Sequence, residues 1–373
     1  MRVLLAPDSF KGCLSSVEVC NAIEAGIKLA DNEIDVVQFP SSDGGEGFCD
    51  CMRNIFGGET VAREVTLPLG NRGIAEFVYN SETNTAYIEL ASASGLTLVP
   101  EDKRNIMASS TLGTGELIIF AIELGATTIV LGLGGSATND CGIGILYALG
   151  MRFFDVNRKE LLPNAESLDK VVSIDEEGMY DLSGIKFIAA CDVKNPLCGK
   201  NGAAEVFSRQ KGASEYEVKQ LDKACLSFAS VLGIDPNIPG SGAAGGVGAA
   251  VLSVLKGRYV SGASLIADSC AFDAALAESD LLITGEGNTD AQTVYGKLVS
   301  VILAAAQRRG VPSIVLSGGL SEGYEALAKL GAVGFYALKN EDLTLEYCLT
   351  HARELLTSRS YELICEYKEK ASV

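Results

Sequence analysis

Three side chains near the start of the chain have the chemistry to bind or act on an anionic group. Asp8, Ser9 and Lys11 lie in the stretch Ala6–Gly12, between a predicted buried strand at Val3–Ala6 and a predicted helix. A lysine on such a turn, beside the N–H groups at a helix start, is suited to an anionic oxygen of a phosphate or a carboxylate. An ordinary surface turn that Asp8 caps explains the same residues, and composition alone favours that alternative.

Acidic residues between glycines form a second candidate site. Asp43 and Glu46 lie in Ser42–Gly47, after the predicted strand Ile34–Phe39. Glycines let a ligand or a metal approach the backbone closely, and one or two carboxylates with waters are a common way to hold Mg²⁺. A simple turn with Asp43 as a helix N-cap is equally compatible with the sequence.

A third group of polar residues follows the predicted strand Leu281–Thr284. It contains Glu286 and Asp290, and Lys297 comes shortly after them. Carboxylates beyond a buried strand are the usual seat of Mg²⁺ in phosphoryl transfer, and a downstream lysine can neutralise phosphate oxygens. No stretch of the sequence fits the G-x-x-x-x-G-K-[ST] pattern, which excludes a P-loop.

The glycine-rich stretch Gly132–Asp140 has two functional interpretations. It follows the predicted strand Thr128–Leu131, so its N–H groups can form a nest that cradles a phosphate. It also fits the dinucleotide fingerprint over Gly132–Ala137, and Asp155 lies at roughly the spacing of a ribose-binding acid. An NAD-dependent dehydrogenase of a small hydroxy acid is therefore the alternative function. Tight packing of a helix on a strand is the purely structural explanation.

Two further segments carry candidate polar residues. Asp192 follows the predicted strand Phe187–Ala190, and Gln210 and Lys211 lie in a local basic cluster at Ser208–Gly212. Surface turns explain either segment equally well. The single histidine lies in the polar C-terminal region, away from every glycine-rich turn, which argues against a Ser-His-Asp triad and against histidine acid-base catalysis. We therefore expect any general base to be an aspartate or a glutamate.

The composition limits the classes of partner and the location. The chain has 373 residues and a net charge of −18, and such a surface repels nucleic acid and anionic membranes. Neither is an expected partner. The 11 cysteines contain no paired C-x-x-C framework, and the N-terminus turns polar too early for a signal peptide. We therefore expect a reducing, cytoplasmic location.

A regular alternation of predicted elements positions these side chains. Apolar runs of strand length alternate with helical patterns, which is typical of βαβ units and a mainly parallel, doubly wound sheet. A capping box from Ser15 to Glu18 predicts a helix through about Ala30. Between about Val61 and Leu98 polar and apolar residues alternate, which predicts antiparallel strands and the start of an inserted second domain. The other predicted elements are strands at Val61–Leu67, Ile74–Tyr79, Thr85–Leu90 and Ser313–Leu316, and helices at Val294–Arg309 and from Leu343 to about Leu356.

Taken together, these segments resemble the bacterial type 1 glycerate kinase family. The resemblance runs from residue 1 to about residue 319, with the family's motifs in order. These motifs are APDSFKG (Ala6–Gly12), DGGEG (Asp43–Gly47), ASASGLTLV (Ala91–Val99), GTGELI (Gly113–Ile118), LGLGGSATND (Leu131–Asp140), CDVKNPL (Cys191–Leu197), QKGAS (Gln210–Ser214), GAAGGVGA (Gly242–Ala249) and TGEGNTDAQT (Thr284–Thr293). Two departures are notable: Cys141 stands where glycine is common, and Asn288 stands where Arg or Lys commonly precedes the position of Asp290.

The resemblance implies ATP-dependent phosphorylation of glycerate with Mg²⁺. We expect D-glycerate as the acceptor and favour 2-phosphoglycerate over 3-phosphoglycerate as the product, while the sequence leaves the choice of hydroxyl open. It also implies two α/β domains with the active site in the cleft between them. We expect residues 1–66 and 261–373 to form a discontinuous Rossmann-like (flavodoxin-like) domain with a doubly wound parallel sheet. Residues 67–260 are expected to form an inserted α/β domain with a mixed sheet, in a monomer or homodimer.

Within this framework each candidate residue receives an expected role. Asp192 is expected to orient or deprotonate the acceptor hydroxyl, with Asp8 and Asp43 as alternatives. Glu286 and Asp290 are expected to hold Mg²⁺. The residues expected to contact phosphate or the substrate carboxylate are Lys11, Ser9, Gly134, Gly135, Ser136, Asn139, Gln210, Lys211 and Lys297.

Overall fold

The computed structural model of the chain divides into two compact units. The first unit consists of Met1–Ser42, Asp50–Phe56 and Gly262–Val373, and the second consists of Asp43–Cys49 and Gly57–Ser261. The structure describes residues 1–10, 12–42, 44–294, 298–340 and 342–371.

The first unit is built on a five-stranded parallel sheet to which both ends of the chain contribute. Its strand order is β15-β13-β11-β1-β2, and every neighbouring pair is parallel. Counted along the chain within this unit, the order is 2-1-3-4-5, which is the flavodoxin-like, doubly wound arrangement that we expected. These strands are β1 (Arg2–Leu5), β2 (Asp35–Gln38), β11 (Leu281–Thr284), β13 (Ser313–Ser317) and β15 (Ala332–Ala337).

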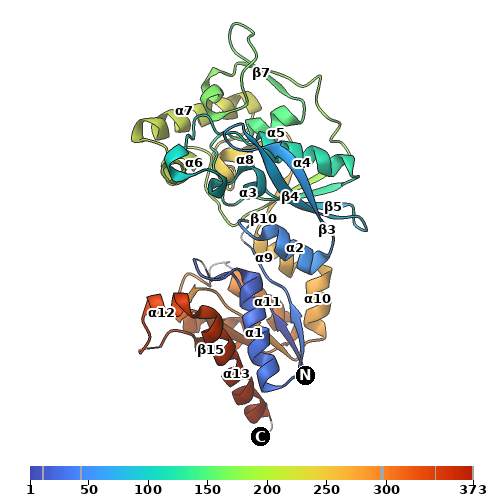
Figure 1. Cartoon of the computed structure of the whole chain (residues 1–373), viewed down its shortest axis with the longest axis vertical. Helices are drawn as coiled ribbons and strands as arrows, with labels where there is room; N and C mark the ends of the chain where they lie inside the picture. Colours follow the sequence, from blue (N-terminus) through green and yellow to red (C-terminus); the bar gives the residue numbers. More distant parts are fainter. Residues whose placement is uncertain (11, 43, 295–297, 341, 372–373) are drawn as a thin grey trace. The chain divides into compact units, whose positions relative to one another are not determined.

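Helices cover both faces of this sheet, which is why its central strands β1, β11 and β13 are mainly apolar and buried. α1 (Ser16–Ala30) and α13 (Ala352–Ala371) lie side by side (Figure 1) and bury one face of the sheet, including Ile314 of β13. α11 (Leu298–Arg309) packs against Val315, which points to the opposite face. The unit also contains α9 (Gly262–Ala267), α10 (Cys270–Ala277), α12 (Leu345–Thr350) and the short pair β12 (Asn288–Thr289) and β14 (Gly319–Leu320).

α1 begins where the sequence predicted, because Ser15 caps it. The Ser15 hydroxyl accepts the N–H of Glu18, and the Glu18 carboxylate accepts the N–H of Ser15 at 2.9 Å. Further along the helix, a β-carbon at Gly26 would collide with the backbone carbonyl of Thr357 in α13. The lack of a side chain at Gly26 therefore lets the two helices pack closely.

The second unit is built on a six-stranded mixed sheet. Its order is β10-β9-β6-β5-β4-β3, with β5, β6, β9 and β10 parallel and with β3 and β4 antiparallel. The mixed sheet is the one expected for the inserted domain. Because β3 pairs with β4, residues 57–66 belong to this unit, whereas the expected boundary placed them in the first domain. The strands are β3 (Glu59–Thr66), β4 (Arg72–Asn80), β5 (Thr85–Glu89), β6 (Thr128–Gly132), β9 (Lys186–Ala190) and β10 (Arg258–Val260).

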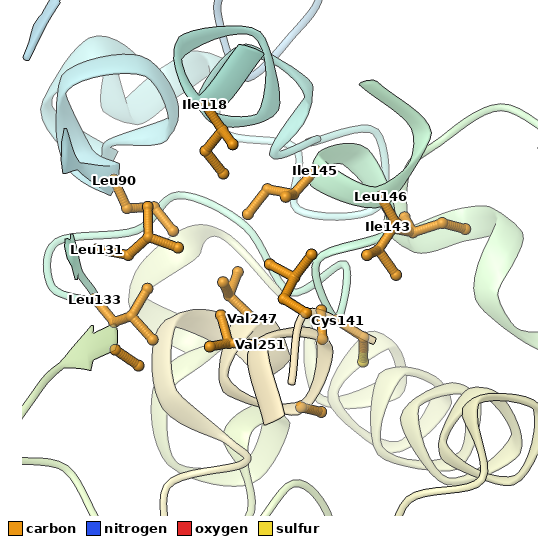
Figure 2. Close-up of a cluster of buried hydrophobic side chains, with 14 of the residues drawn as sticks. Leu90, Ile118, Leu131, Leu133, Cys141, Ile143, Ile145, Leu146, Val247 and Val251 are labelled. Carbon is orange, nitrogen blue, oxygen red and sulfur yellow. The ribbon is translucent and has the colours of Figure 1, made fainter. Parts of the chain in front are cut away.

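A large apolar core packs against this sheet and anchors the glycine-rich loop that follows β6. Figure 2 shows Leu131 and Leu133 at the start of that loop and Cys141 and Ile143 at its end, converging with Val247 and other apolar side chains. All five are at most 2% exposed, so both ends of the loop are held in the core. The helices of this unit are α3 (Leu90–Ser94), α4 (Leu112–Glu123), α5 (Ile143–Ala148), α6 (Ala203–Phe207), α7 (Glu215–Leu232) and α8 (Ala243–Ser253), and α2 (Phe48–Phe56) begins in it.

Several elements differ from the sequence predictions or were absent from them. The single helix expected from Leu343 to about Leu356 is wrong: α12 ends at Thr350 and α13 continues to Ala371, with the break at His351. The strand β15 and a separate two-stranded antiparallel sheet of β7 (Arg152–Phe154) and β8 (Ser173–Asp175) were not predicted. None of the described helices combines the length and the apolar character that a membrane crossing requires.

Candidate functional site

The first unit brings the loops after β1 and β11 together, because these strands are neighbours in its sheet. The Asp8 N–H donates to the Gly285 carbonyl at 2.8 Å, and the Thr284 hydroxyl donates to the Ala6 carbonyl at 2.8 Å. The strand order reverses between β1 and β11, and ligands of open α/β sheets bind at such a switch point. The Asp8 carboxylate accepts the N–H of Ser9 at 2.7 Å. Since Ser15 caps α1, Asp8 is not the cap of that helix.

Glu286 and Asp290 lie on the loop after β11 and are linked by one hydroxyl. The Thr293 Oγ1 donates to the Glu286 Oε1 at 2.6 Å and accepts the N–H of Asp290 at 3.1 Å. The Asp290 Oδ1 also accepts the N–H of Gln292 at 2.8 Å, so this carboxylate closes a local turn. Both acids are partly buried at the carboxyl end of the sheet. The first unit therefore brings Asp8, Ser9, Glu286 and Asp290 into one region.

Sequence reasoning missed Ser317, which supports this loop. Its Oγ lies 2.7 Å from the Thr289 hydroxyl and 3.4 Å from the N–H of Glu286. The signal was available, because Ser317 directly follows the predicted strand Ser313–Leu316, and the observed strand β13 pairs with β11. Asn288, the departure from the family pattern, is exposed, and its Oδ1 accepts the Ser321 hydroxyl at 3.0 Å.

The second unit gathers its candidate residues at the carboxyl ends of β5, β6 and β9. Gly132 lies opposite Glu89 on one side and Ala190 on the other, so the loops after these strands meet at one edge of the sheet. The Cys191 thiol contacts the Leu133 carbonyl at 3.5 Å, which ties the loop after β9 to the loop after β6. Asp192 follows Cys191 and is exposed at this edge.

The turn Gly134–Ser136 presents unused N–H groups at the same edge. The Leu96 N–H donates to the Gly135 carbonyl at 2.8 Å, and the Ala137 N–H donates to the Ser94 carbonyl at 2.9 Å. These two hydrogen bonds fix the turn to the end of α3. Within the described residues, the N–H groups of Gly134, Gly135 and Ser136 donate to no protein acceptor. Gly135 has a φ of +65° and is exposed. Successive N–H groups around a left-handed residue form an anion-binding concavity.

A buried polar layer lies beneath this turn. The Lys211 ammonium is 3% exposed and donates to the Ser136 Oγ at 2.6 Å and to the Thr138 carbonyl at 2.7 Å. Asn139 is fully buried and donates to the Cys225 sulfur at 3.2 Å. Neither side chain therefore reaches the exposed face of the turn.

Asp140 completes this buried layer. Its carboxylate accepts the N–H and the hydroxyl of Thr111 at 2.7 and 2.8 Å, and the N–H groups of Gly142 and Gly144 at 3.1 and 3.4 Å. Burial raises the pKa of this carboxyl, and these hydrogen bonds oppose the rise. Asp140 thereby ties the loop to the starts of α4 and α5.

The expected basic cluster at Ser208–Gly212 does not form one charged patch. Arg209 is exposed and pairs with Glu205 and Glu215, which raise its pKa, whereas Lys211 points into the interior. Gln210 is exposed between them. The two basic side chains therefore have different roles.

The glycines of the segment 44–47 serve packing. A β-carbon on Gly134 would lie only 2.6 Å from the nitrogen of Gly45, and a β-carbon on Gly132 only 2.7 Å from the carbonyl oxygen of Gly44. The backbone of this segment therefore lies directly on the start of the loop after β6. We expected these glycines to let a ligand or a metal approach. At Gly44 and Gly45, the backbone of the loop after β6 occupies that space instead.

Glu89 is a partly buried acid that sequence reasoning did not single out. Its carboxylate accepts the N–H groups of Gly47, Phe48 and Cys49, so it caps α2 from the end of β5. Burial raises its pKa to about 7, and the nearby Glu46 adds to the rise. The available signal was a glutamate at the end of an apolar strand.

Three candidate residues, Lys11, Asp43 and Lys297, lie outside the described residues. The remaining candidates form two groups, one in each unit. Asp8, Ser9, Glu286 and Asp290 belong to the first unit, and the second unit holds the others, namely Gly134, Gly135, Ser136, Asn139, Asp192, Gln210 and Lys211.

The donor set for a metal is small. Among the described residues, no three His, Cys, Asp or Glu side chains gather in a way that could hold a metal ion. Mg²⁺ usually takes only one or two protein carboxylates and completes its shell with waters and substrate phosphates. Glu286 and Asp290, joined through Thr293, fit that smaller set.

The dinucleotide interpretation of Gly132–Ala137 is not supported. The next helix, α5, begins only at Ile143, so the turn does not lie at a helix start as a dinucleotide turn requires. Asp155 follows β7, which pairs with β8 in a separate two-stranded sheet. Its carboxylate accepts the N–H groups of Asn157 and Lys159 in a local turn.

Comparisons with known proteins cover nearly the whole chain. The model of the Glycerate kinase family matches residues 3–368. A relative from Bacillus cereus named glycerate kinase is 41% identical over 374 residues, which covers 99% of this chain and 98% of the relative. A relative from Escherichia coli named glycerate 2-kinase is 39% identical over 328 residues, 86% of each chain. The crystal structure of a provisionally assigned glycerate kinase 2 from Salmonella typhimurium LT2 matches all of both chains, with a TM-score of 0.86 and 36% identity.

Proposed function

We propose a reaction for this chain from one premise: it belongs to the glycerate kinase family and is a phosphotransferase, as its ordered motifs predicted. The proposed reaction is transfer of the γ-phosphoryl group of ATP to the 2-hydroxyl of D-glycerate, with Mg²⁺ as the metal. The observation that carries this proposal is the family match across almost the entire chain, since every described candidate segment lies inside it.

In the first unit, Glu286 and Asp290 would hold Mg²⁺. A bound Mg²⁺ would neutralise charge on the phosphate oxygens. The Thr293 hydroxyl contributes by fixing the Glu286 carboxylate relative to the backbone of Asp290. Asp8 and Ser9 lie on the adjacent loop and are suited to contact the substrate hydroxyls.

In the second unit, the Gly134–Ser136 turn would bind an anionic oxygen, and Asp192 would act on the acceptor. Phosphoryl transfer needs positioning and charge neutralisation more than covalent catalysis. The three N–H groups of this turn, which have no acceptor among the described residues, would supply such neutralisation at no cost in side-chain ordering. Asp192 is exposed at the same edge of the sheet, where its carboxylate would orient or deprotonate the acceptor hydroxyl.

The remaining proposals concern partners and location. ATP and D-glycerate are the proposed small-molecule partners, and the net charge of −18 argues against nucleic acid and anionic membranes. A monomer or homodimer and a cytoplasmic location stay predictions.

The test is an ADP-release assay with Mg-ATP and D-glycerate, run beside L-glycerate and a control without acceptor. We expect ADP release in the presence of D-glycerate but not with L-glycerate or without an acceptor. The ³¹P NMR spectrum of the product should identify 2-phosphoglycerate. A 3-phosphoglycerate signal would correct the position but keep the reaction class. No turnover by folded protein would contradict the proposed function.

A further inference from the structure

The lysine beneath the Gly134–Ser136 turn is buried, whereas a lysine that binds a ligand directly is exposed at the surface. Lys211 is 3% exposed, and its ammonium donates to the side chain of Ser136 and to the carbonyl of Thr138. Both acceptors belong to the loop itself. Burying an ammonium is costly unless it is paired and hydrogen-bonded. Lys211 takes part in none of the ion pairs found among the described residues.

We propose that Lys211 is a positioning residue that fixes the Gly134–Ser136 turn from beneath and adds positive potential to an anion bound on its outer face. By donating to the Ser136 hydroxyl and the Thr138 carbonyl, the ammonium holds the turn in a conformation in which its N–H groups have no acceptor among the described residues. This inference rests on the proposed function in taking that anion to be a phosphate of ATP or the carboxylate of D-glycerate.

The surroundings of Lys211 make its charge responsive to a ligand. Burial lowers the pKa of its ammonium to about 7, while Asp140 on the loop and Cys225 on α7 oppose that shift. The other titratable groups beside this cluster are the thiols of Cys141 and Cys198, and burial and their neighbours raise the pKa of both. We therefore expect part of the Lys211 population to be neutral at pH 8 in the free protein.

A bound anion would favour the protonated form of Lys211. An opposite charge nearby raises the pKa of an ammonium, so binding above pH 7 should draw a proton from the buffer. A lysine that only shapes the loop would not couple binding to proton uptake. Proton uptake therefore separates the proposed role from a purely structural one.

The experiment is isothermal titration calorimetry at pH 8 in two buffers with different ionisation enthalpies. In separate arms, the full-length protein with Mg²⁺ is titrated with the non-hydrolysable analogue AMP-PNP and with D-glycerate. For whichever ligand occupies the turn, the binding enthalpy should differ between the two buffers. Dividing that difference by the difference in buffer ionisation enthalpy should give an uptake of a substantial fraction of one proton per binding event. Equal heats in both buffers for both ligands, or no binding of either, would overturn the inference.

Two variants and a control sharpen this test. Lys211→Met should weaken binding of the ligand that occupies the turn by about tenfold or more, because the positive charge of the ammonium is lost. The same substitution should remove the proton uptake. Lys211→Arg should restore affinity without proton uptake, because a guanidinium stays charged. Lys223→Met changes an exposed lysine of α7 and should match the parent protein. Parent-like binding and proton uptake in Lys211→Met would overturn the inference.

The outcome is distinguishable from that of the proposed function. If AMP-PNP binds with proton uptake but D-glycerate is not phosphorylated, the inference about Lys211 stands and the proposed reaction fails. If D-glycerate is phosphorylated without any proton uptake on binding, only the inference about Lys211 fails.

Discussion

At the scale of single residues, Asp192 and Lys211 lie in the same unit but have opposite environments. Asp192 is exposed after β9, where a carboxylate can reach a substrate, whereas Lys211 is buried under the neighbouring loop. Exposure at the carboxyl end of a parallel strand favours a direct role in chemistry. Burial, together with ammonium hydrogen bonds to Ser136 and Thr138 of the loop, favours a role in positioning.

Asp192→Asn should lower kcat by about 100-fold or more while leaving the affinity for ATP nearly unchanged. The amide keeps the shape of the side chain but cannot accept the proton of the acceptor hydroxyl, and losses of this size are typical of general-base variants. Steady-state kinetics and nucleotide titration measure both quantities. Asp102→Asn changes an exposed aspartate of the same unit and is the control. Parent-like turnover in Asp192→Asn would remove this residue from the mechanism.

Glu286→Gln should raise the Mg²⁺ concentration needed for half-maximal rate by about tenfold or more, since a neutral amide is a weaker ligand for a hard cation. The amide oxygen can still accept the Thr293 hydroxyl, so the loop should keep its shape. A Mg²⁺ titration of the rate measures the effect. Glu322→Gln, on an exposed glutamate of the first unit, is the matched control. An unchanged titration would place the metal elsewhere.

At the scale of elements, the sequence predicted those features that local patterns determine. The capping box located the start of α1, and the apolar run Leu281–Thr284 coincides with β11. The break at His351 was missed because the helical pattern continues across it. Likewise, the sequence grouped Arg209 with Lys211, although one pairs with surface acids and the other lies in the interior, which only tertiary packing decides.

The two glycine-rich segments of the second unit are also an element-scale feature, because their backbones pack directly on each other. Gly134→Ala would place a β-carbon 2.6 Å from the nitrogen of Gly45, so the segments must separate. We expect a loss of unfolding free energy of about 1–3 kcal/mol, as overpacked sites typically show. Gly184→Ala is the control, because no atom lies within 4 Å of a β-carbon there. Urea unfolding of both variants measures the difference, and equal midpoints would refute this packing role.

At the scale of the whole molecule, the chain folds back so that its two ends build one unit. The sheet of the first unit takes β1 and β2 from the N-terminal end and β11, β13 and β15 from the C-terminal end. Each large core cluster is confined to one unit: one runs from Val65 to Leu255 in the second, and another joins Val3 to Ile364 in the first. Separate cores are the physical basis for separate folding units.

This arrangement predicts that the fragment of residues 57–261 folds alone, whereas residues 1–56 and 262–373 do not fold as isolated fragments. The fragment 57–261 keeps all six strands of its sheet and the whole of its large core. Residues 1–56 retain only two strands of a five-stranded sheet, which cannot bury enough apolar surface to offset the loss of chain entropy. Circular dichroism and urea titration should show a cooperative transition for 57–261, and mixing the two outer fragments should restore structure to both. A fragment 57–261 that lacks a cooperative transition would mean that the packing of residues 44–47 against the loop after β6 is needed for the second unit to fold.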